Sequence, residues 1–381
     1  MEQFTMIATT TFGIEAICKR ELIALGYKVI KTENGKVTFL SDVEGIVRAN
    51  LWLRTADRVL IQVGEFSAVT FDELFDQTKA LPWGEIIPEN GKFVVNGKSI
   101  KSKLFSISDS QRIVKKAIVE SLKETYSVDW LEETGADYTC QVSLLKDIAT
   151  ITIDTSGGAL HKRGYRVKSV TAPLKETLAA SLILLSFWNK DRVLYDLFCG
   201  SGTIPIEAAM IGRNIAPGLN RDFASKHWDI IPNEVWKEET RKAYQAIDHD
   251  AEIKIFASDI DENNLRCAEE NAQEAGVEDC ITFKVSDFKD MWLENDYSII
   301  ISNPPYGERL EDEAGVRKIY HNLSYKFKNM DTWSKYFITS YKEFEKAFHE
   351  EADRKRKLYN GRIETWYYQY YGPRPKRETI E

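Results

Sequence analysis

The sequence predicts an α/β protein in which a doubly wound, mainly parallel sheet follows two smaller α/β units. From about residue 175 onward, short apolar runs typical of strands alternate with helical runs, a pattern that indicates a parallel sheet with helices on both faces. Before that point, strands come in neighbouring pairs around amphipathic helices, which is typical of small separate α/β layers. A chain of 381 residues is long enough for two or three such domains.

The first predicted unit spans residues 1–66 and has the order strand, helix, strand, strand, helix, strand. A strand is expected at 4–9, and apolar residues at helical spacing from Ile14 predict a helix that Gly26 ends. Asn34-Gly35 is a tight-turn signal between strands at 27–31 and 36–40. A helix at 43–51 and a strand at 58–66 complete the split βαβ pattern of a ferredoxin-like unit.

The second predicted unit spans residues 67–160. Thr70 and Glu73 form a capping box that opens a helix, and Pro82 ends it. A basic strand and turn at 92–103, a helix at 110–122 and strands at 138–145 and 147–154 follow. Gly157-Gly158 marks the end of the unit, and residues 161–174 are expected to be a linker.

The third predicted unit spans residues 175–381. Its parallel strands are expected at 192–198, 253–259, 281–287, 297–303 and 335–340. The turn Asn360-Gly361 joins two further strands, at 355–359 and 362–371, into an antiparallel hairpin. An insertion at about 213–250 separates the first two strands; it contains Trp228 and Trp236, which we expect to cover the sheet by plain packing and not to form a lid.

Charge is distributed unevenly along a chain whose net charge is −8 at pH 7. Residues 92–116 hold seven Lys and Arg against one acid, residues 161–175 hold five against none, and residues 354–377 hold eight against one. Three unopposed basic stretches in an acidic chain favour a local polyanion-binding surface over scattered solvated charges.

Features of secreted, membrane or metal-binding proteins do not stand out. The start of the chain carries no basic segment before an apolar run, and the apolar stretch at 178–188 is too short to span a bilayer. We therefore expect a cytoplasmic protein without membrane contact. The five cysteines contain no C-x-x-C pair, which predicts reduced structural thiols and no metal site; they are Cys18, Cys140, Cys199, Cys267 and Cys280.

Ligands of open α/β sheets bind at the carboxyl ends of the strands. The first strand ends in Asp196 and a turn with Gly200 and Gly202, where a ligand can approach the backbone closely. The second ends at Asp259, the usual position of a carboxylate that binds ribose hydroxyls, while Asp261 is expected to cap the next helix. The third ends at Asp287-Phe288, an acid and a ring suited to adenine.

The fourth strand end carries Asn303-Pro304-Pro305-Tyr306. An exocyclic base amine or an amide nitrogen is a poor nucleophile, because its lone pair is delocalised. It needs acceptors for its two hydrogens and a flat surface that holds the ring. The side-chain oxygen of Asn303 and the carbonyl of Pro304 provide acceptors, and Tyr306 provides the stacking surface. No general base is required.

These four strand ends together resemble the class I S-adenosylmethionine-dependent methyltransferases that methylate amines, over about residues 165–372. The resemblance implies a Rossmann-like seven-stranded methyltransferase sheet, with S-adenosyl-L-methionine as cofactor. It implies a catalytic set of Asn303, Pro304, Pro305 and Tyr306. It implies that the cofactor is bound by Asp196, Phe198, Gly200, Gly202, Thr203, Asp259, Ile260, Asp287, Phe288 and Asn303.

The whole chain resembles the THUMP-domain RNA methyltransferases, on the two N-terminal units, "HKRGYR" at 161–166 and "APLKETLAA" at 172–180. Within them it is most similar to the large-subunit ribosomal RNA guanine-N2 methyltransferases. RNA, ribosomal RNA in particular, is the implied partner, bound by Lys98, Lys101, Lys103, Arg112, Lys115, Lys116, Lys162, Arg163 and Arg166. For Arg163 and Arg166, a bridge between domains is equally compatible with the sequence.

Several alternatives stay open at this point. The acceptor is either guanine N2 or adenine N6, and the substrate is ribosomal or transfer RNA. DNA adenine and protein glutamine methyltransferases share the fourth-strand motif but have different N-terminal regions, and a non-catalytic RNA-binding protein is a further alternative. The sequence does not determine the oligomeric state.

Overall fold

The computed structural model describes residues 3–167, 173–306 and 313–375. The middle of the predicted linker and the last basic residues, Lys376 and Arg377, lie outside this part of the chain. The chain forms two compact units. The first comprises the chain up to Thr10, Cys18–Leu160 and Arg221–Lys242, and the second comprises Thr11–Ile17, His161–Asn220 and the chain from Ala243 onward.

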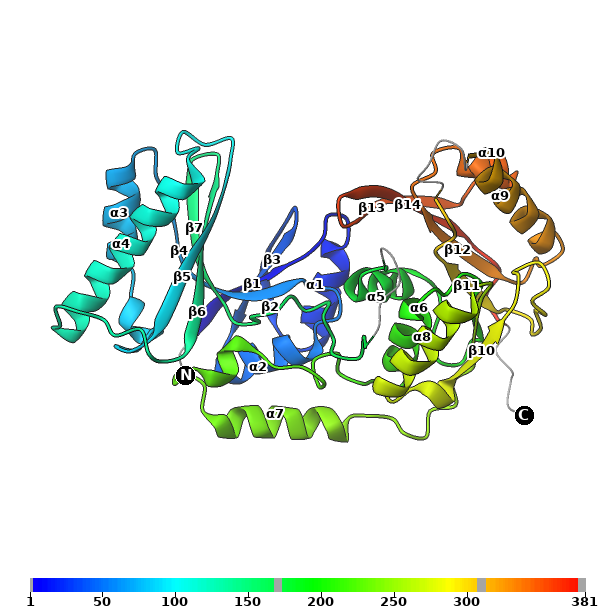
Figure 1. Cartoon of the computed structure of the whole chain (residues 1–381), viewed down its shortest axis with the longest axis horizontal. Helices are drawn as coiled ribbons and strands as arrows, with labels where there is room; N and C mark the ends of the chain where they lie inside the picture. Colours follow the sequence, from blue (N-terminus) through cyan, green and yellow to red (C-terminus); the bar gives the residue numbers. More distant parts are fainter. Residues whose placement is uncertain (1–2, 168–172, 307–312, 376–381) are drawn as a thin grey trace. The chain divides into compact units, whose positions relative to one another are not determined.

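The first unit contains one seven-stranded sheet in the order β2-β3-β1-β4-β7-β6-β5 (Figure 1). The long strand β4 pairs with β1 through its first half and with β7 through most of its length, so the two predicted N-terminal layers share a single sheet. The β5–β6 pair is parallel, and the other neighbouring strands of this sheet pair antiparallel. The strands are β1 (Phe4–Thr9), β2 (Lys28–Glu33), β3 (Lys36–Ser41), β4 (Arg58–Ser67), β5 (Lys92–Ile100), β6 (Asp137–Leu145) and β7 (Ile148–Asp154).

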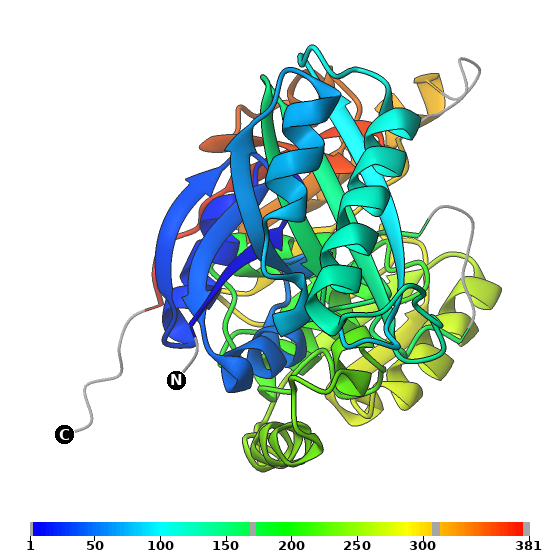
Figure 2. The same cartoon turned by 90° about the vertical axis from the view of Figure 1, so that its left-hand side faces the viewer.

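Helices of the N-terminal region begin and end close to the predicted signals. They are α1 (Glu15–Ala24), α2 (Val43–Trp52), α3 (Phe71–Lys79) and α4 (Ile107–Tyr126). The capping box of Thr70 and Glu73 is present at the start of α3. Helix α4 is longer than predicted, because Ser106 caps it four residues before the predicted start at Ser110. Figure 2 shows α3 and α4 side by side on one face of the sheet.

The second unit is built on a sheet in the order β10-β9-β8-β11-β12-β14-β13. Strands β8 to β12 are parallel and β14 runs antiparallel between β12 and β13, which confirms the predicted parallel sheet with a terminal hairpin. Its strand order reverses direction between β8 and β11, the point at which open sheets bind ligands. The strands are β8 (Leu194–Asp196), β9 (Ile255–Asp259), β10 (Ile281–Val285), β11 (Ile299–Ser302), β12 (Ser334–Thr339), β13 (Arg354–Asn360) and β14 (Ile363–Tyr370).

Helices cover both faces of this second sheet. Ile299 and Ile301 of β11 belong to one buried apolar cluster with Leu178, while Ile300 belongs to another with Phe344. This alternation places α5 (Glu176–Leu185), α6 (Thr203–Gly212) and α8 (Glu262–Glu274) on one face, and α9 (Glu313–Phe327) and α10 (Phe344–Phe348) on the other. No helix in the described ranges is long and apolar enough to cross a membrane.

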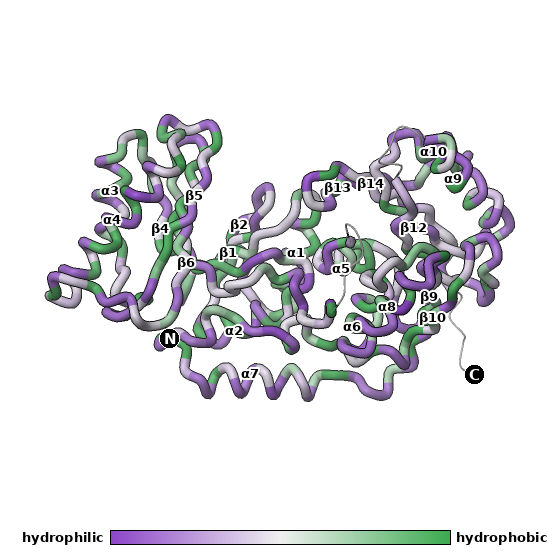
Figure 3. Tube along the Cα trace, in the orientation of Figure 1, coloured by the Kyte–Doolittle hydropathy of each residue, from purple (hydrophilic) through white to green (hydrophobic). Residues whose placement is uncertain are grey.

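The insertion packs differently from the prediction. Its residues 221–242 belong to the first unit and not to the unit that contains the parallel sheet. Trp228 stacks on Tyr138 of β6 with ring centroids 4.6 Å apart, and its Nε1 donates to the carbonyl of Asp137 at 3.1 Å. The insertion carries α7 (Asn233–Gln245), which is mostly hydrophilic, in contrast to α5 and α6 (Figure 3). The prediction that Trp228 packs against a sheet is thus correct, but the sheet is that of the first unit and not the parallel sheet of the second.

Candidate active site

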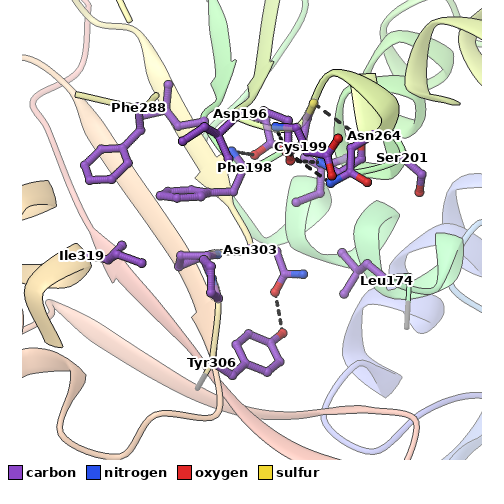
Figure 4. A pocket seen from close by; sticks show the side chains of 18 of the residues that line it. Leu174, Asp196, Phe198, Cys199, Ser201, Asn264, Phe288, Asn303, Tyr306 and Ile319 are labelled. Atoms are coloured by element: carbon purple, nitrogen blue, oxygen red, sulfur yellow. Dashed lines mark hydrogen bonds between the residues drawn. The ribbon is translucent and has the colours of Figure 1, made fainter. Parts of the chain in front are cut away.

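A cavity of about 780 Å³ lies at the carboxyl ends of β8, β9, β10 and β11. It lies within the second unit and is lined by the loop that follows each of these four strands, and by α9 (Figure 4). The volume is within the usual range for a small-molecule or cofactor site. The four strand ends that the sequence singled out therefore meet in one place.

The glycine turn after β8 forms one wall. Gly200 and Gly202 both have left-handed backbones, with φ of 53° and 82°. A Cβ at Gly202 would lie 2.9 Å from the Cβ of Ala268 on α8, so this glycine is required by packing. A Cβ at Gly200 would meet nothing within 4 Å, and Gly200 lines the cavity. At Gly200 the backbone is therefore open to a ligand.

The carboxylate of Asp259 fixes this turn. The backbone N–H of Gly200 donates to its Oδ2 at 2.9 Å, while the N–H of Asp261 and the side chain of Asn264 donate to its Oδ1. Asp259 also lines the cavity, so its remaining acceptor capacity is available to a ligand there. Asp261 accepts from the N–H of Asn263 and caps α8, which confirms its predicted role.

Asp196 is the most strongly perturbed acid of the site. It is 1% exposed, and its Oδ1 accepts from the Ser302 hydroxyl at 2.9 Å and from the N–H of Phe198 at 3.2 Å. Its Oδ2 has no hydrogen-bond partner within the described part of the chain. Burial, with a smaller contribution from the charge of Asp259, raises the pKa of Asp196 to about 7. A buried acceptor without a partner beside an open cavity fits a ligand that brings a donor.

The loops after β8 and β10 together contribute an aromatic pair to the cavity wall. The rings of Phe198 and Phe288 lie 5.2 Å apart at 39°. Beside them, Asp287 accepts from the backbone and the ammonium group of Lys289, each at 3.0 Å. Partial burial opposes ionisation of Asp287, but the Lys289 contacts lower its pKa overall. Ile260, 72% exposed, and Thr203 also line the cavity. This arrangement suits a nucleobase.

The turn after β11 forms the opposite wall. The Tyr306 hydroxyl donates to Oδ1 of Asn303 at 2.5 Å (Figure 4). The buried Tyr320 of α9 donates its hydroxyl to the carbonyl of Pro305 at 2.7 Å and bonds the Thr339 hydroxyl at 2.8 Å. Burial raises the pKa of Tyr320, so this donor stays protonated. The turn is thus held from beneath by a residue that sequence reasoning missed, since Tyr320 carries no signal beyond a place on the buried face of a helix.

Two of the predicted RNA-binding arginines have other partners. Arg163 is 2% exposed, and its guanidinium lies 3.3 Å from the carboxylate of Glu207, which also accepts from the Tyr165 hydroxyl. Burial opposes the charge of Arg163, but Glu207 raises its pKa overall. A buried guanidinium cannot reach RNA phosphates, so of the two roles considered for Arg163 the RNA-binding one is wrong.

Arg166 supports the glycine turn after β8. Its guanidinium donates to Glu176 at 2.7 Å, to the Ser201 hydroxyl at 2.8 Å and to the Thr203 hydroxyl at 2.9 Å. These bonds use the donors that a phosphate would need, which corrects the RNA-binding prediction for Arg166. Sequence reasoning missed Glu176, because an acid in the first turn of a helix ordinarily indicates no more than helix stabilisation.

The other predicted RNA-binding residues are accessible to a partner. Lys98, Lys101, Lys103, Arg112, Lys116 and Lys162 are exposed, and Lys115 is half-buried. Arg112 pairs with Asp109, and Lys115 lies 3.6 Å from Glu133. Surface pairs of this kind are weak and exchange readily with a polyanion. The RNA-binding role of these residues stays a prediction.

Three family models match the chain. The model of the RMKL-like methyltransferase domain matches residues 163–369, more than half of the chain. The model of the RlmL ferredoxin-like domain matches residues 5–60, and that of the THUMP domain matches residues 68–154.

Individual proteins agree with these matches. The chain is 52% identical to a Bacillus subtilis protein named "Putative RNA methyltransferase YpsC", over the full length of both. It is 34% identical to the "Ribosomal RNA large subunit methyltransferase K/L" of Shewanella pealeana, covering 92% of this chain but 50% of that protein. Among solved structures, "SMU.472, a putative methyltransferase complexed with SAH" is 43% identical with a TM-score of 0.94, covering 99% of this chain and 100% of that one.

Proposed function

Since the chain belongs to the RMKL-like family of S-adenosylmethionine-dependent RNA methyltransferases, we propose that it methylates an exocyclic base amine, guanine N2 of large-subunit ribosomal RNA. The observation that carries this proposal is the shared cavity. The Asn303-Pro304-Pro305-Tyr306 turn and the Gly200 turn line the same space. An amine held by the first turn therefore faces a ligand held by the second.

The cavity residues fit the cofactor. The open backbone at Gly200 and the unpartnered oxygen of Asp196 would hold its methionine part, Asp259 its ribose, and Asp287 with Phe288 its adenine. When bound, S-adenosylmethionine supplies an electrophilic methyl group on a sulfonium.

The chain positions the acceptor amine. Oδ1 of Asn303 accepts one amine hydrogen in exchange for the Tyr306 hydroxyl, and the Pro304 carbonyl accepts the other. With both hydrogens bound in this way, the lone pair points out of the base plane. Tyr320 keeps the turn in place through the Pro305 carbonyl, so the acceptors need no rearrangement during the reaction. The proton that the methylated amine loses passes to water.

The choice of large-subunit ribosomal RNA rests on relatives, and the choice of guanine N2 rests on the resemblance found in the sequence. Proteins named large-subunit ribosomal RNA methyltransferase K/L align with this chain, which spans about half of their length. Because those proteins are twice as long, their named activity supports the proposal without transferring as a whole. The alternatives are guanine N2 of transfer RNA and adenine N6, and both use the same turn.

Asn303→Ala tests the proposal. We expect this variant still to bind S-adenosylmethionine and to show turnover reduced by about a hundredfold or more, because it lacks one of the two amine acceptors. Tyr306→Phe is the matched control, since it keeps the stacking ring and removes only the hydroxyl. Isothermal titration measures binding, and transfer of a labelled methyl group measures turnover. Undiminished turnover of Asn303→Ala would remove the turn from the mechanism.

Nucleoside mass spectrometry decides the target. Ribosomal and transfer RNA from cells with and without the protein are digested and compared. Loss of N2-methylguanosine from large-subunit RNA is the expected result. Loss of N6-methyladenosine, or a change confined to transfer RNA, would select the corresponding alternative.

A further inference from the structure

A second pocket, of about 390 Å³, is also lined by α9. Its lining residues are Ala314, Arg317, Lys318, His321, Ala347 and His349. The residues of α9 that line the active-site cavity are Gly315, Val316 and Ile319. At 3.6 residues per turn these two sets lie on opposite faces of the helix. The thickness of α9 therefore separates the second pocket from the active-site cavity, and both belong to the second unit.

The second pocket is cationic. Arg317 and Lys318 are exposed and form no ion pair within the described ranges. No acidic side chain of the described residues lines the pocket, and two alanines leave room beside the cations. Three acidic side chains of the α10 region are engaged elsewhere, in the pairs Glu343 with Lys346, Glu345 with Lys355 and Glu350 with Lys335. Glu313 and Glu351 are exposed and do not line the pocket. The charge of Arg317 and Lys318 is thus available to an anion.

Two histidines complete the pocket. Nδ1 of His321 and Nε2 of His349 lie 2.8 Å apart, and the rings are nearly perpendicular. When the pair is neutral, one ring donates to the other, and of the two remaining nitrogens one is a donor and one an acceptor, whichever tautomer is present. One added proton turns both remaining nitrogens into donors. The pair can therefore always donate to an anion.

We infer that this pocket binds a backbone phosphate of the RNA strand that carries the target base, an inference that rests on the proposed function. Arginine and lysine bind phosphates through charge-assisted hydrogen bonds, and such contacts position a strand without reading its sequence. A helix is about 10–12 Å thick with its side chains. This is about three nucleotides at the 3.4 Å rise of a stacked strand. A phosphate held here would fix the strand so that its base reaches Asn303.

Imidazole NMR of the full chain tests the pocket directly. The chain has five histidines, and single His→Gln variants assign their signals. Inorganic phosphate should shift the signals of His321 and His349 and leave those of His161, His227 and His249 in place. The shift should disappear in Arg317→Ala/Lys318→Ala and persist in Lys346→Ala, which removes a nearby charge outside the pocket. Equal shifts at all five histidines, or none at His321 and His349, would overturn the anion site.

RNA distinguishes the source of the phosphate. Unmodified large-subunit ribosomal RNA transcribed in vitro should compete with inorganic phosphate for the same two histidine signals. Arg317→Ala/Lys318→Ala should bind this RNA about tenfold more weakly, with the salt dependence of log K reduced by about 0.7, and should bind S-adenosylhomocysteine as the wild type does. If phosphate shifts the signals but RNA does not compete, the RNA part of the inference is wrong.

The two proposals fail separately. A wild-type chain that methylates none of the RNAs tested contradicts the proposed function, and the phosphate titration still decides whether the pocket is an anion site. A chain that methylates RNA while Arg317→Ala/Lys318→Ala keeps wild-type RNA affinity contradicts the pocket alone.

Discussion

The buried carboxyl of Asp196 predicts that the stability of the cofactor-free protein decreases as the pH rises. The pKa of its buried carboxyl is raised from 3.8 to about 7. Between these values the folded chain binds more protons than the unfolded chain, so the free energy of unfolding falls as the pH rises. The contribution of Asp196 is fully present below its unfolded pKa and disappears as the pH passes through 7. The rise of the pKa from 3.8 to about 7 corresponds to about 4 kcal/mol of unfolding free energy.

Asp196→Asn should remove this dependence. The amide cannot ionise, so between pH 4 and 7 the stability of the variant should fall by up to about 4 kcal/mol less than that of the wild type. Ser302→Ala removes the hydroxyl that stabilises the ionised form of Asp196. In this variant the pH-dependent loss of stability should therefore occur at a higher pH than in the wild type. Urea unfolding between pH 4 and 8.5, without cofactor, measures all three proteins. The reasoning is refuted if the stabilities of Asp196→Asn and the wild type fall in parallel over this range.

Three further predictions concern packing and charge. Gly202→Ala should destabilise the chain by more than about 1 kcal/mol, because φ at this position is 82° and the added Cβ would lie 2.9 Å from that of Ala268. Gly200→Ala should mainly weaken cofactor binding. Thermal unfolding measures the first effect, and titration with the cofactor measures the second. Glu207→Gln should cost about 3–5 kcal/mol in urea unfolding by leaving Arg163 buried without a carboxylate, while Arg163→Met/Glu207→Leu should recover most of that stability; equal destabilisation of the two variants would contradict the pairing. Reversing the charge of Lys101, Lys103, Lys115 and Lys116 should weaken RNA binding. The slope of log K against log[salt] should become shallower by about 0.7–0.9 for each phosphate that these side chains neutralise in the wild type. Unchanged binding in filter assays would exclude these four lysines from the RNA-binding surface.

Short sequence signals correctly predict hairpin turns and the start of a helix. Asn34-Gly35 joins β2 to β3 as predicted, and the Thr70 capping box opens α3. The predicted hairpin at Asn360-Gly361 is also present, but Asn360 ends β13, so that Gly361 and Arg362 form the turn. Such signals depend on residues a few positions apart, so the sequence carries them in full. Strand ends are predicted less accurately: the first parallel strand is expected at 192–198, but β8 is Leu194–Asp196. Residues 197–201, which follow β8, leave the ladder and line the cavity.

The predictions for Arg163 and Trp228 failed for a different reason, since the contacts of each side chain are made with a residue far away in the sequence. Arg163 is charged and lies in a basic stretch, which favours RNA binding, yet its carboxylate partner is 44 residues away. Trp228 lies within the insertion, but the ring it stacks on, Tyr138, precedes it by 90 residues (228 − 138). Burial of a charge or an aromatic ring is decided by tertiary contacts, which periodicity does not encode.

The cofactor turn shows what those distant contacts accomplish. Asp259 at the end of β9 binds the N–H of Gly200, and Asn271 of α8 donates to the carbonyl of Ser201 at 3.1 Å. Arg166 binds the hydroxyls of Ser201 and Thr203. Three separate segments thus hold three of the four residues 200–203 before any ligand arrives, which lowers the ordering cost of binding. The sequence identifies the turn through its glycines. Asn271 and Arg166 add rigidity to this turn, a role that the sequence predicts for neither of them. Neither residue lines the cavity, so a substitution at either position should weaken cofactor binding without touching the cavity wall.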